Sequence, residues 1–170
     1  MKRFAFLLVF LLSVKVSVRA ATIRDLTEIR SLYDQSASSK TVARQLLEML
    51  TKLDLQSDPL MVCYKGAAEM IQAKYAFSPI SKLSSFRKGK LLIENAIARD
   101  RDGIEMRYLR FTIQTNLPGF LGYSGEIEND KQFLLKKLDV VNDKVLKNNI
   151  ITYLAASKYC TEAERKKLKK

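Results

Sequence analysis

Apolar residues recur every three or four positions along most of the chain, which is the spacing of amphipathic helices. A clear example is the stripe formed by Val42, Leu46, Leu50 and Leu53. No segment sustains the two-residue alternation that is typical of a half-buried strand. The chain also has only six glycines and three prolines, which are few for a fold of many short strands and turns. The pattern therefore predicts an all-α fold.

Capping residues followed by proline indicate where two of these helices begin. Asp58-Pro59 and Ser78-Pro79 each place a capping side chain before a proline at the first helical position. Similar signals at the other junctions separate the remaining apolar stripes. The expected helices cover residues 22–33, 40–55, 59–77, 79–99, 102–116, 124–141 and 142–159.

Two further pairs of residues have the spacing of a capping box. Asp102 with Glu105 predicts a cap for the fifth helix, which residues 117–119, Leu-Pro-Gly, then interrupt. Thr161 with Glu164 predicts a cap for a basic C-terminal turn or two. The sequence thus gives both a start and an end for the fifth helix.

An internal period connects three of the expected helix starts. Asp58, Asp102 and Asp143 stand at successive junctions, 44 and 41 residues apart. An apolar residue follows each aspartate two places later, and a tyrosine follows the first two aspartates six places later. A period of this length with two helices per unit is typical of helical-hairpin solenoids. The alternative is that the aspartates reflect only the general preference of helix starts for a capping side chain.

The fifth helix has two apolar stripes on nearly opposite sides. At about 100° per residue, Ile104, Tyr108 and Phe111 form one stripe. The other stripe consists of Met106, Leu109, Ile113 and Leu117. A surface helix needs only one apolar face, so we expect this helix to be packed from both sides and to be the most buried in the molecule.

The stretch Glu94–Asp102 resembles the end of a tetratricopeptide unit. Ala96 and Asp100 match the closing turn of that family, whereas Arg101 stands where the family usually has proline. The helix that follows also lacks the family's Leu-Gly pair. The resemblance implies about seven helices, packed as antiparallel hairpins in a right-handed array.

A longer part of the chain is similar to small exported helical proteins of Gram-negative bacteria to which no function is assigned. The similarity covers most of residues 30–140 and includes the stretches 64–69, 73–75, 107–111 and 121–123. It implies a location in the cell envelope or outside the cell, and it implies no mechanism.

The first twenty residues have the three parts of a secretory signal peptide. Lys2 and Arg3 precede an apolar run over residues 4–14, and residues 18–20, Val-Arg-Ala, offer a cleavage site. The apolar run is too short to span a bilayer, which requires about 20 residues. An uncleaved anchor is the alternative, because basic residues are unusual between the apolar run and the cleavage site. We expect the protein to be exported to the periplasm or secreted.

Charge then distinguishes the expected parts of the mature chain, a helical domain over 21–160 and a basic tail over 161–170. The full chain has a formal charge of +12, and residues 1–20 hold four basic residues and no acidic one, so +8 remains without them. A basic surface favours anionic partners such as lipid headgroups or acidic polysaccharide, with peripheral membrane contact through the tail. The alternative is a solvated surface that serves solubility alone. No aromatic residues alternate with the lysines of the tail, so we expect no nucleic-acid partner.

The reactive side chains argue against an enzyme. The chain has no histidine, which excludes Ser-His and Cys-His pairs and the commonest metal ligand. It also lacks a Walker loop and a dinucleotide fingerprint. Asp100, Asp102 and Glu105 do not have the spacing of a calcium loop, and helix capping explains them. Paired carboxylates remain open as an alternative, with Glu94, Glu105 and Asp130 as candidates, but nothing in the sequence pairs them. We expect no catalytic residue, no metal and no cofactor.

The two cysteines, Cys63 and Cys160, both lie in apolar helical stretches. Export would permit a disulfide between them. The alternative, which we favour, is that each is a small buried apolar side chain.

One face of the fifth helix contains the best candidate for a binding site. Arg107, Arg110 and Gln114 share this face, and Asn116 and Tyr123 follow around the Pro-Gly break. Two arginines and an amide could bind a carboxylate or phosphate of a partner. The alternative, which we favour, is that the arginines pair with internal acids, for which the candidates are Glu69, Glu94 and Asp130. The sequence therefore predicts a non-enzymatic binding or scaffold protein, or alternatively an envelope protein that contacts anionic lipid or polysaccharide through its basic tail.

Overall fold

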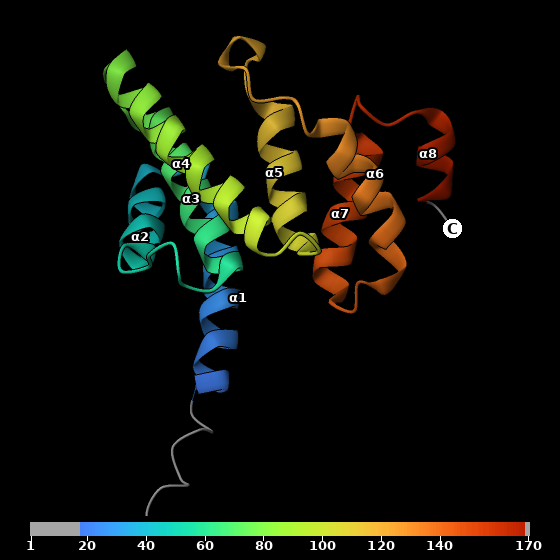
Figure 1. Ribbon diagram of the computed structural model, residues 1–170, viewed down its shortest axis with the longest axis horizontal. Helices are drawn as coiled ribbons and strands as arrows, with labels where there is room; N and C mark the ends of the chain where they lie inside the picture. Colours follow the sequence, from blue (N-terminus) through green and yellow to red (C-terminus); the bar gives the residue numbers. More distant parts are fainter. Residues whose placement is uncertain (1–17, 169–170) are drawn as a thin grey trace, which may run out of the picture.

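The computed structural model describes residues 18–168, with side chains from Leu26 onward, and every regular element in that range is a helix. Figure 1 shows their arrangement. The α-helices are α1 (Val18–Ser36), α2 (Lys40–Leu50), α3 (Pro59–Tyr75), α4 (Pro79–Arg99), α5 (Ile104–Asn116), α6 (Ile127–Lys137), α7 (Lys144–Ala156) and α8 (Glu162–Lys167). Two short 3-10 helices follow α5 and α6, namely η1 (Gly119–Leu121) and η2 (Leu138–Val140). The predicted all-α fold is confirmed.

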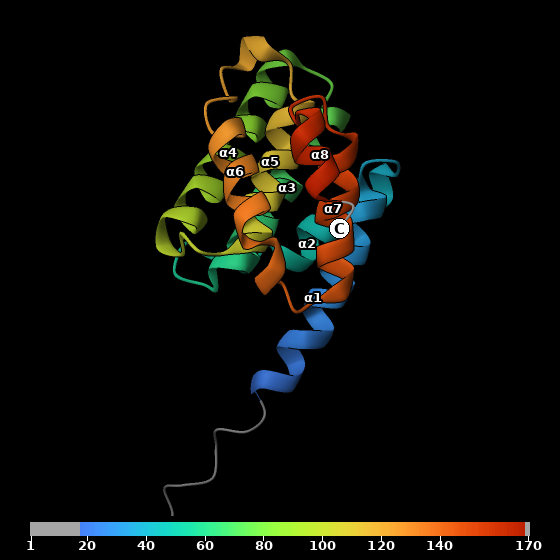
Figure 2. The same cartoon turned by 90° about the vertical axis from the view of Figure 1, so that its right-hand side faces the viewer.

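Consecutive helices pair as hairpins. α1 packs on α2, α3 on α4 and α5 on α6, and the contact between α3 and α4 is the most extensive. The first helices of these pairs also contact one another in order, because α3 touches both α1 and α5, and α5 touches α7. Figures 1 and 2 show the resulting row, which runs from α1 and α2 at one end to α7 and α8 at the other. The odd-numbered helices thus lie beside one another.

The fifth helix separates two hydrophobic clusters. Met106 and Leu109 belong to the cluster formed mainly by α1 to α4, whereas Phe111 belongs to the cluster formed mainly by α6 and α7. Ile113 packs against the first cluster and Tyr108 against the second. The predicted two-sided packing of this helix is therefore confirmed, and α5 connects the two halves of the core.

α3 and α4 cross closely because two buried glycines face each other. A Cβ atom added to Gly66 would lie 2.8 Å from the carbonyl oxygen of Gly89, and a Cβ atom added to Gly89 would lie 2.5 Å from the carbonyl oxygen of Gly66. Side chains at these positions would push the helices apart. The glycines therefore account for the tight hairpin that α3 and α4 form.

Most of the predicted caps are present. Asp58, Ser78 and Asp143 each accept hydrogen bonds from backbone N–H groups in the first turn of α3, α4 and α7. Thr161 and Glu164 form the predicted capping box of α8. These side chains satisfy N–H groups that a helix start otherwise leaves without a partner.

The predicted capping box of Asp102 with Glu105 is wrong. Gly103 precedes the first residue of α5, and no side chain caps this helix. The Glu105 carboxylate instead accepts hydrogen bonds from Arg30 and Tyr64, because it points into the molecule rather than back along its own helix.

Several helices differ in length from the prediction. α2 ends at Leu50 rather than 55, because the Asp54 carboxylate accepts the N–H groups of Gln56 and Ser57 and forms a turn. α1 covers 18–36 instead of 22–33, and α6 and α7 are each shorter than predicted at both ends. Amphipathic spacing continues into the connecting turns, and local side-chain hydrogen bonds then determine where the helix ends.

The predicted C-terminal tail is folded over residues 161–168. α8 lies beside α6 and α7, where Leu168 is buried in the second cluster. Arg165 donates a hydrogen bond to the carbonyl oxygen of Ser157, and Lys131 of α6 forms an ion pair with Glu164. The basic side chains Lys166 and Lys167 remain exposed.

The predicted signal peptide lies largely outside the described residues. Its last three residues, 18–20, form the start of α1, and the apolar run before them is not described. Among the helices of residues 18–168, none is both long and apolar enough to span a bilayer.

Candidate functional site

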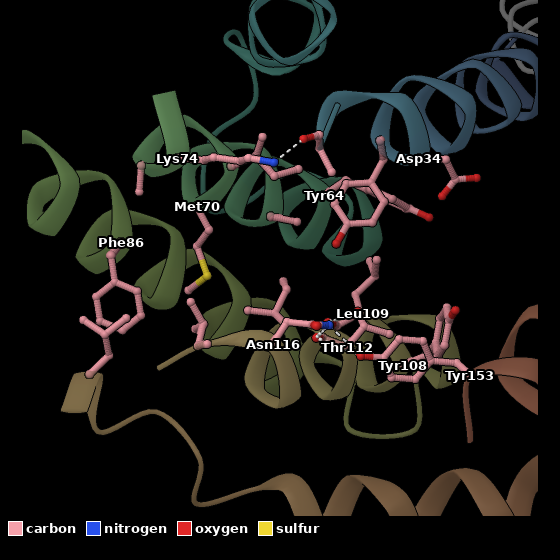
Figure 3. Close-up of a pocket in the computed structure, with 18 of the residues that line it drawn as sticks. Asp34, Tyr64, Met70, Lys74, Phe86, Tyr108, Leu109, Thr112, Asn116 and Tyr153 are labelled. Atoms are coloured by element: carbon pink, nitrogen blue, oxygen red, sulfur yellow. Dashed lines mark hydrogen bonds between the residues drawn. The ribbon is translucent and has the colours of Figure 1, made fainter. Parts of the chain in front are cut away.

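A large groove runs across several of the helices. It has a volume of 1320 Å³ and is lined by α1, α3, α5 and α7, together with the start of α4 and residues 117–121. Figure 3 shows α3 and α5 on opposite walls, with Phe86 of α4 at one end and Tyr153 of α7 at the other. The groove thus follows the row of odd-numbered helices.

The walls of the groove are mostly apolar and aromatic. Met70 of α3 lines one wall and Leu109 of α5 the other, and Ile113 of α5 also lines the groove. Four tyrosines also line it, namely Tyr33, Tyr64, Tyr108 and Tyr153. The rings of Tyr33 and Tyr64 pack edge to face, as do those of Tyr108 and Tyr153. Such a wall buries an apolar ligand well, because aromatic rings provide a large rigid contact area.

A partly buried network in the wall of the groove joins α1, α3 and α5 to the start of α7. The Arg30 guanidinium donates to both carboxylate oxygens of Glu105, at 2.7 and 2.6 Å, and to Asp143 at 2.7 Å. The Tyr64 hydroxyl donates to the same Glu105 carboxylate at 2.6 Å. Burial, together with this carboxylate, raises the pKa of Tyr64. The pKa of Arg30 is raised mainly by its hydrogen bond to Glu105, so the guanidinium stays charged.

Other polar groups of the groove are also bonded within the protein. The Asn116 amide donates to the carbonyl oxygen of Thr112 and to the Tyr153 hydroxyl. Lys74 donates to the carbonyl oxygen of Ala37 at 2.6 Å. Burial raises the pKa of Tyr108 to about 12, which keeps this hydroxyl neutral at physiological pH. The donors of Asn116 and Lys74 are therefore already engaged within the protein.

The groove reaches solvent where the start of α4 and η1 line it. Leu83 of α4 lines one side of this opening and Phe120 the other, and both side chains are exposed. Lys82 lies on the same side as Leu83. We call this opening the mouth of the groove.

The comparisons with known proteins identify no relative. No family model, curated protein or solved structure matches this chain. The function is therefore inferred from the geometry of the site.

The arginine face of α5 lies away from the groove and is occupied by internal acids. Arg110 donates from Nε and Nη2 to both oxygens of Asp130, at 2.7 and 2.9 Å, and from Nη1 to Glu94 at 2.6 Å. Arg107 forms an ion pair with the same Asp130 carboxylate and lies over the ring of Phe133. Asp130 is fully buried. This arrangement matches the interpretation that we favoured from the sequence, in which internal acids pair with the arginines.

The other predicted site residues divide between two places. Tyr123 joins the arginine cluster, because its hydroxyl donates a hydrogen bond to Glu94 at 2.6 Å. The Tyr123 side chain is buried, and this burial raises its pKa. Gln114 is buried on the same face of α5, and neither atom of its side-chain amide has a partner among the described residues. Asn116 lies apart from these residues, in the wall of the groove. The five residues therefore do not form one site.

The remaining sequence candidates for chemistry are accounted for by the packing. Cys63 and Cys160 are both buried free thiols, as favoured from the sequence, and burial raises the pKa of each. Glu94, Glu105 and Asp130 each accept hydrogen bonds from an arginine. Within the part of the chain that the structure describes, no three acidic or cysteine side chains are grouped to hold a metal ion.

Sequence analysis did not predict the groove. One signal pointed to it, because Tyr64 and Tyr108, which occupy equivalent places after Asp58 and Asp102, both line its walls. Arg30 and Tyr153 gave no such signal, since their position in the groove depends on how four separate helices pack.

Proposed function

We propose that this chain is an exported, non-enzymatic binding protein whose groove holds a long apolar ligand, an acyl chain with an acidic headgroup. The size of the groove is the main support: 1320 Å³ exceeds the roughly 300–1,000 Å³ of sites for drug-sized molecules. The row of hairpins adds to this, because the inner helices of tetratricopeptide-like solenoids form concave binding surfaces. Export rests on the signal peptide predicted in residues 1–20.

Most polar side chains of the groove already have hydrogen-bond partners within the protein, which favours an acyl chain over a peptide as the ligand. A bound peptide brings an N–H and a carbonyl group at nearly every residue, and each needs a partner when buried. The groove offers few, because Tyr64, Asn116 and Lys74 already donate within the protein. An acyl chain requires only apolar contact, which Met70 and Leu109 provide.

The charge at the mouth favours an acidic headgroup. Lys82 is exposed there and forms no ion pair with any described residue. Glu105, one of two acids that line the groove, is already paired with Arg30. A carboxylate or phosphate at the mouth would therefore meet a lysine, while the chain extends between α3 and α5.

A fluorescent polyene fatty acid tests this function by titration into the purified protein. The variant Ala73→Trp adds a large side chain to the groove wall on α3, at a half-buried position. The matched control, Ala98→Trp, adds the same side chain to an exposed position of α4 outside the groove. We expect Ala73→Trp to weaken binding by at least about tenfold, since even 1.4 kcal/mol of lost contact gives this factor.

Circular dichroism and thermal unfolding of both variants verify that each is folded. Equal affinities of the two folded variants would show that the groove is not the site. Absence of saturable binding by the unaltered chain would contradict the proposed function.

A further inference from the structure

The turn between α3 and α4 exposes large apolar side chains. Phe77 is 96% exposed and Ile80 is 83% exposed, and Leu83 follows one turn later in α4. Phe120 of η1, on the other side of the mouth, is 87% exposed. Figures 1 and 2 show that the start of α4 and η1 project from the same side of the molecule. Leu83 and Phe120 thus line the mouth, and Phe77 and Ile80 are exposed where α4 begins.

The same region is strongly basic. Residues 70–93 contain five basic side chains and no acidic one, namely Lys74, Lys82, Arg87, Lys88 and Lys90. Lys40 of α2 adds to them, because its Nζ lies 5.1 Å from the centre of the Phe77 ring. Lys88 pairs with Glu69, and among the described residues Lys82 and Arg87 form no ion pair. The exposed apolar side chains thus lie in a segment with an excess of basic residues, and Lys40 lies directly over one of them.

We propose that this end of the molecule docks on an anionic lipid bilayer, with Phe77, Ile80 and Phe120 inserted among the headgroups. Apolar side chains that enter the bilayer boundary and lysines that meet anionic lipids are the two usual contributions to peripheral membrane binding. In this orientation the mouth of the groove faces the bilayer. The groove receives its acyl chain directly from the membrane, a step that rests on the proposed function.

Among the described residues, the large apolar side chains that are more than 80% exposed all lie at this end of the molecule. Leu91 and Val140 are exposed singly, on α4 and η2. The basic C-terminal segment has exposed lysines, Lys166 and Lys167, but its one large apolar side chain, Leu168, is buried. That segment could meet a bilayer through charge alone, without insertion.

Co-sedimentation with vesicles of phosphatidylglycerol and phosphatidylcholine tests the docking. We expect the unaltered chain to bind vesicles rich in phosphatidylglycerol and to bind pure phosphatidylcholine weakly. The variant Phe77→Ser/Ile80→Ser should lose more than roughly tenfold in affinity, because two inserted apolar side chains are removed. The matched control, Leu91→Ser/Val140→Ser, also removes two exposed apolar side chains and should bind as the unaltered chain does.

A second pair of variants tests which lysines contact the anionic lipids. Lys40→Gln/Lys82→Gln should weaken binding by roughly fivefold or more per lysine, whereas Lys166→Gln/Lys167→Gln should leave it nearly unchanged. The opposite result would assign membrane contact to the C-terminal segment and overturn the proposal. Equal vesicle binding by Phe77→Ser/Ile80→Ser and its control would overturn it as well.

The groove variant separates this proposal from the function proposed above. Ala73→Trp should still bind vesicles, because its substitution lies inside the groove and not on the docking surface. Loss of fatty-acid binding with retained vesicle binding therefore concerns the groove alone. Loss of vesicle binding in Phe77→Ser/Ile80→Ser with retained fatty-acid binding concerns the docking alone.

Discussion

Buried charges determine how the helices of this protein are joined. Asp130 is completely buried and is shared by Arg107 and Arg110. Burial by itself lowers the pKa of Arg110, but the hydrogen bond and charge of Asp130 outweigh it and raise this pKa overall. Glu105 has a comparable role in the groove, where its carboxylate forms an ion pair with Arg30. Without Asp130, Arg107 would have no ion-pair partner among the described residues, and Arg110 would keep only the more exposed Glu94 and Glu126.

Removal of the shared carboxylate should therefore destabilise the fold. We expect Asp130→Asn to lower the free energy of unfolding by about 3–5 kcal/mol, since two arginines lose their common partner. Urea unfolding followed by circular dichroism measures the change. The control Glu94→Gln removes a carboxylate whose side chain is 38% exposed and should cost about 1 kcal/mol. An Asp130→Asn protein as stable as the unaltered chain would contradict this account of the arginine cluster.

The sequence predicted the arginine face correctly but not all of its partners. Arg107 and Arg110 share one face of a helix at regular spacing, so their proximity follows from helical geometry. Asp130 and Glu94 were among the expected acids, whereas Glu69 pairs with Lys88 instead. Which acid pairs with each arginine depends on how α4 and α6 pack on α5. The pattern of residues within one helix does not predict this packing.

At the scale of the helix pair, the α3–α4 hairpin depends on two glycines. We expect Gly89→Ala to destabilise the protein by about 1–3 kcal/mol, because the new Cβ would overlap the backbone of α3. The control Gly125→Ala places a Cβ where no atom lies within 4 Å, and its free energy of unfolding should not decrease. The two variants are compared by urea unfolding. Equal stability would mean that the close crossing of α3 and α4 is not required.

The capping box of α8 gives this helix a dependence on pH. Hydrogen bonds from the Thr161 backbone and other partners hold the pKa of Glu164 down at about 2, against an ordinary value of 4.5. Because the folded pKa is the lower one, the stabilisation is complete above about pH 4.5 and is lost as the pH falls towards about 2. We expect the unfolding midpoint of the unaltered chain to fall more steeply over this range than that of Glu164→Gln. Parallel pH profiles would contradict the role of Glu164.

The helix starts were more predictable than the helix ends. Asp58, Ser78 and Asp143 were identified as caps because a single side chain and its neighbours suffice to form one. Glu105 was misassigned because a capping side chain and a side chain that forms a tertiary contact look alike in sequence. The two-sided packing of α5 was predictable, since opposed apolar stripes on one helix leave no other arrangement.

At the scale of the whole molecule, the proposed function depends on features that belong to no single segment. The groove combines side chains from α1, α3, α5 and α7, and the first and last of these helices are more than a hundred residues apart along the chain. Periodicity within each helix predicts what is buried, but not which faces of distant helices leave a space between them. The exposed apolar turn around Phe77 was unpredictable for a similar reason, because an apolar residue beside a helix start is usually covered.

The position of a bound acyl chain shows whether the groove is the binding site. A fatty acid with a nitroxide on its chain is added to protein whose methionine methyl groups carry ¹³C, and the methyl resonances are recorded before and after reduction of the nitroxide. Met70 lines the groove, whereas Met49 is exposed on α2 outside it. The account predicts strong broadening of the Met70 resonance, reversed on reduction, and weaker broadening of Met49. An unbroadened Met70 resonance, or equal broadening of both, would contradict the assignment of the groove as the binding site.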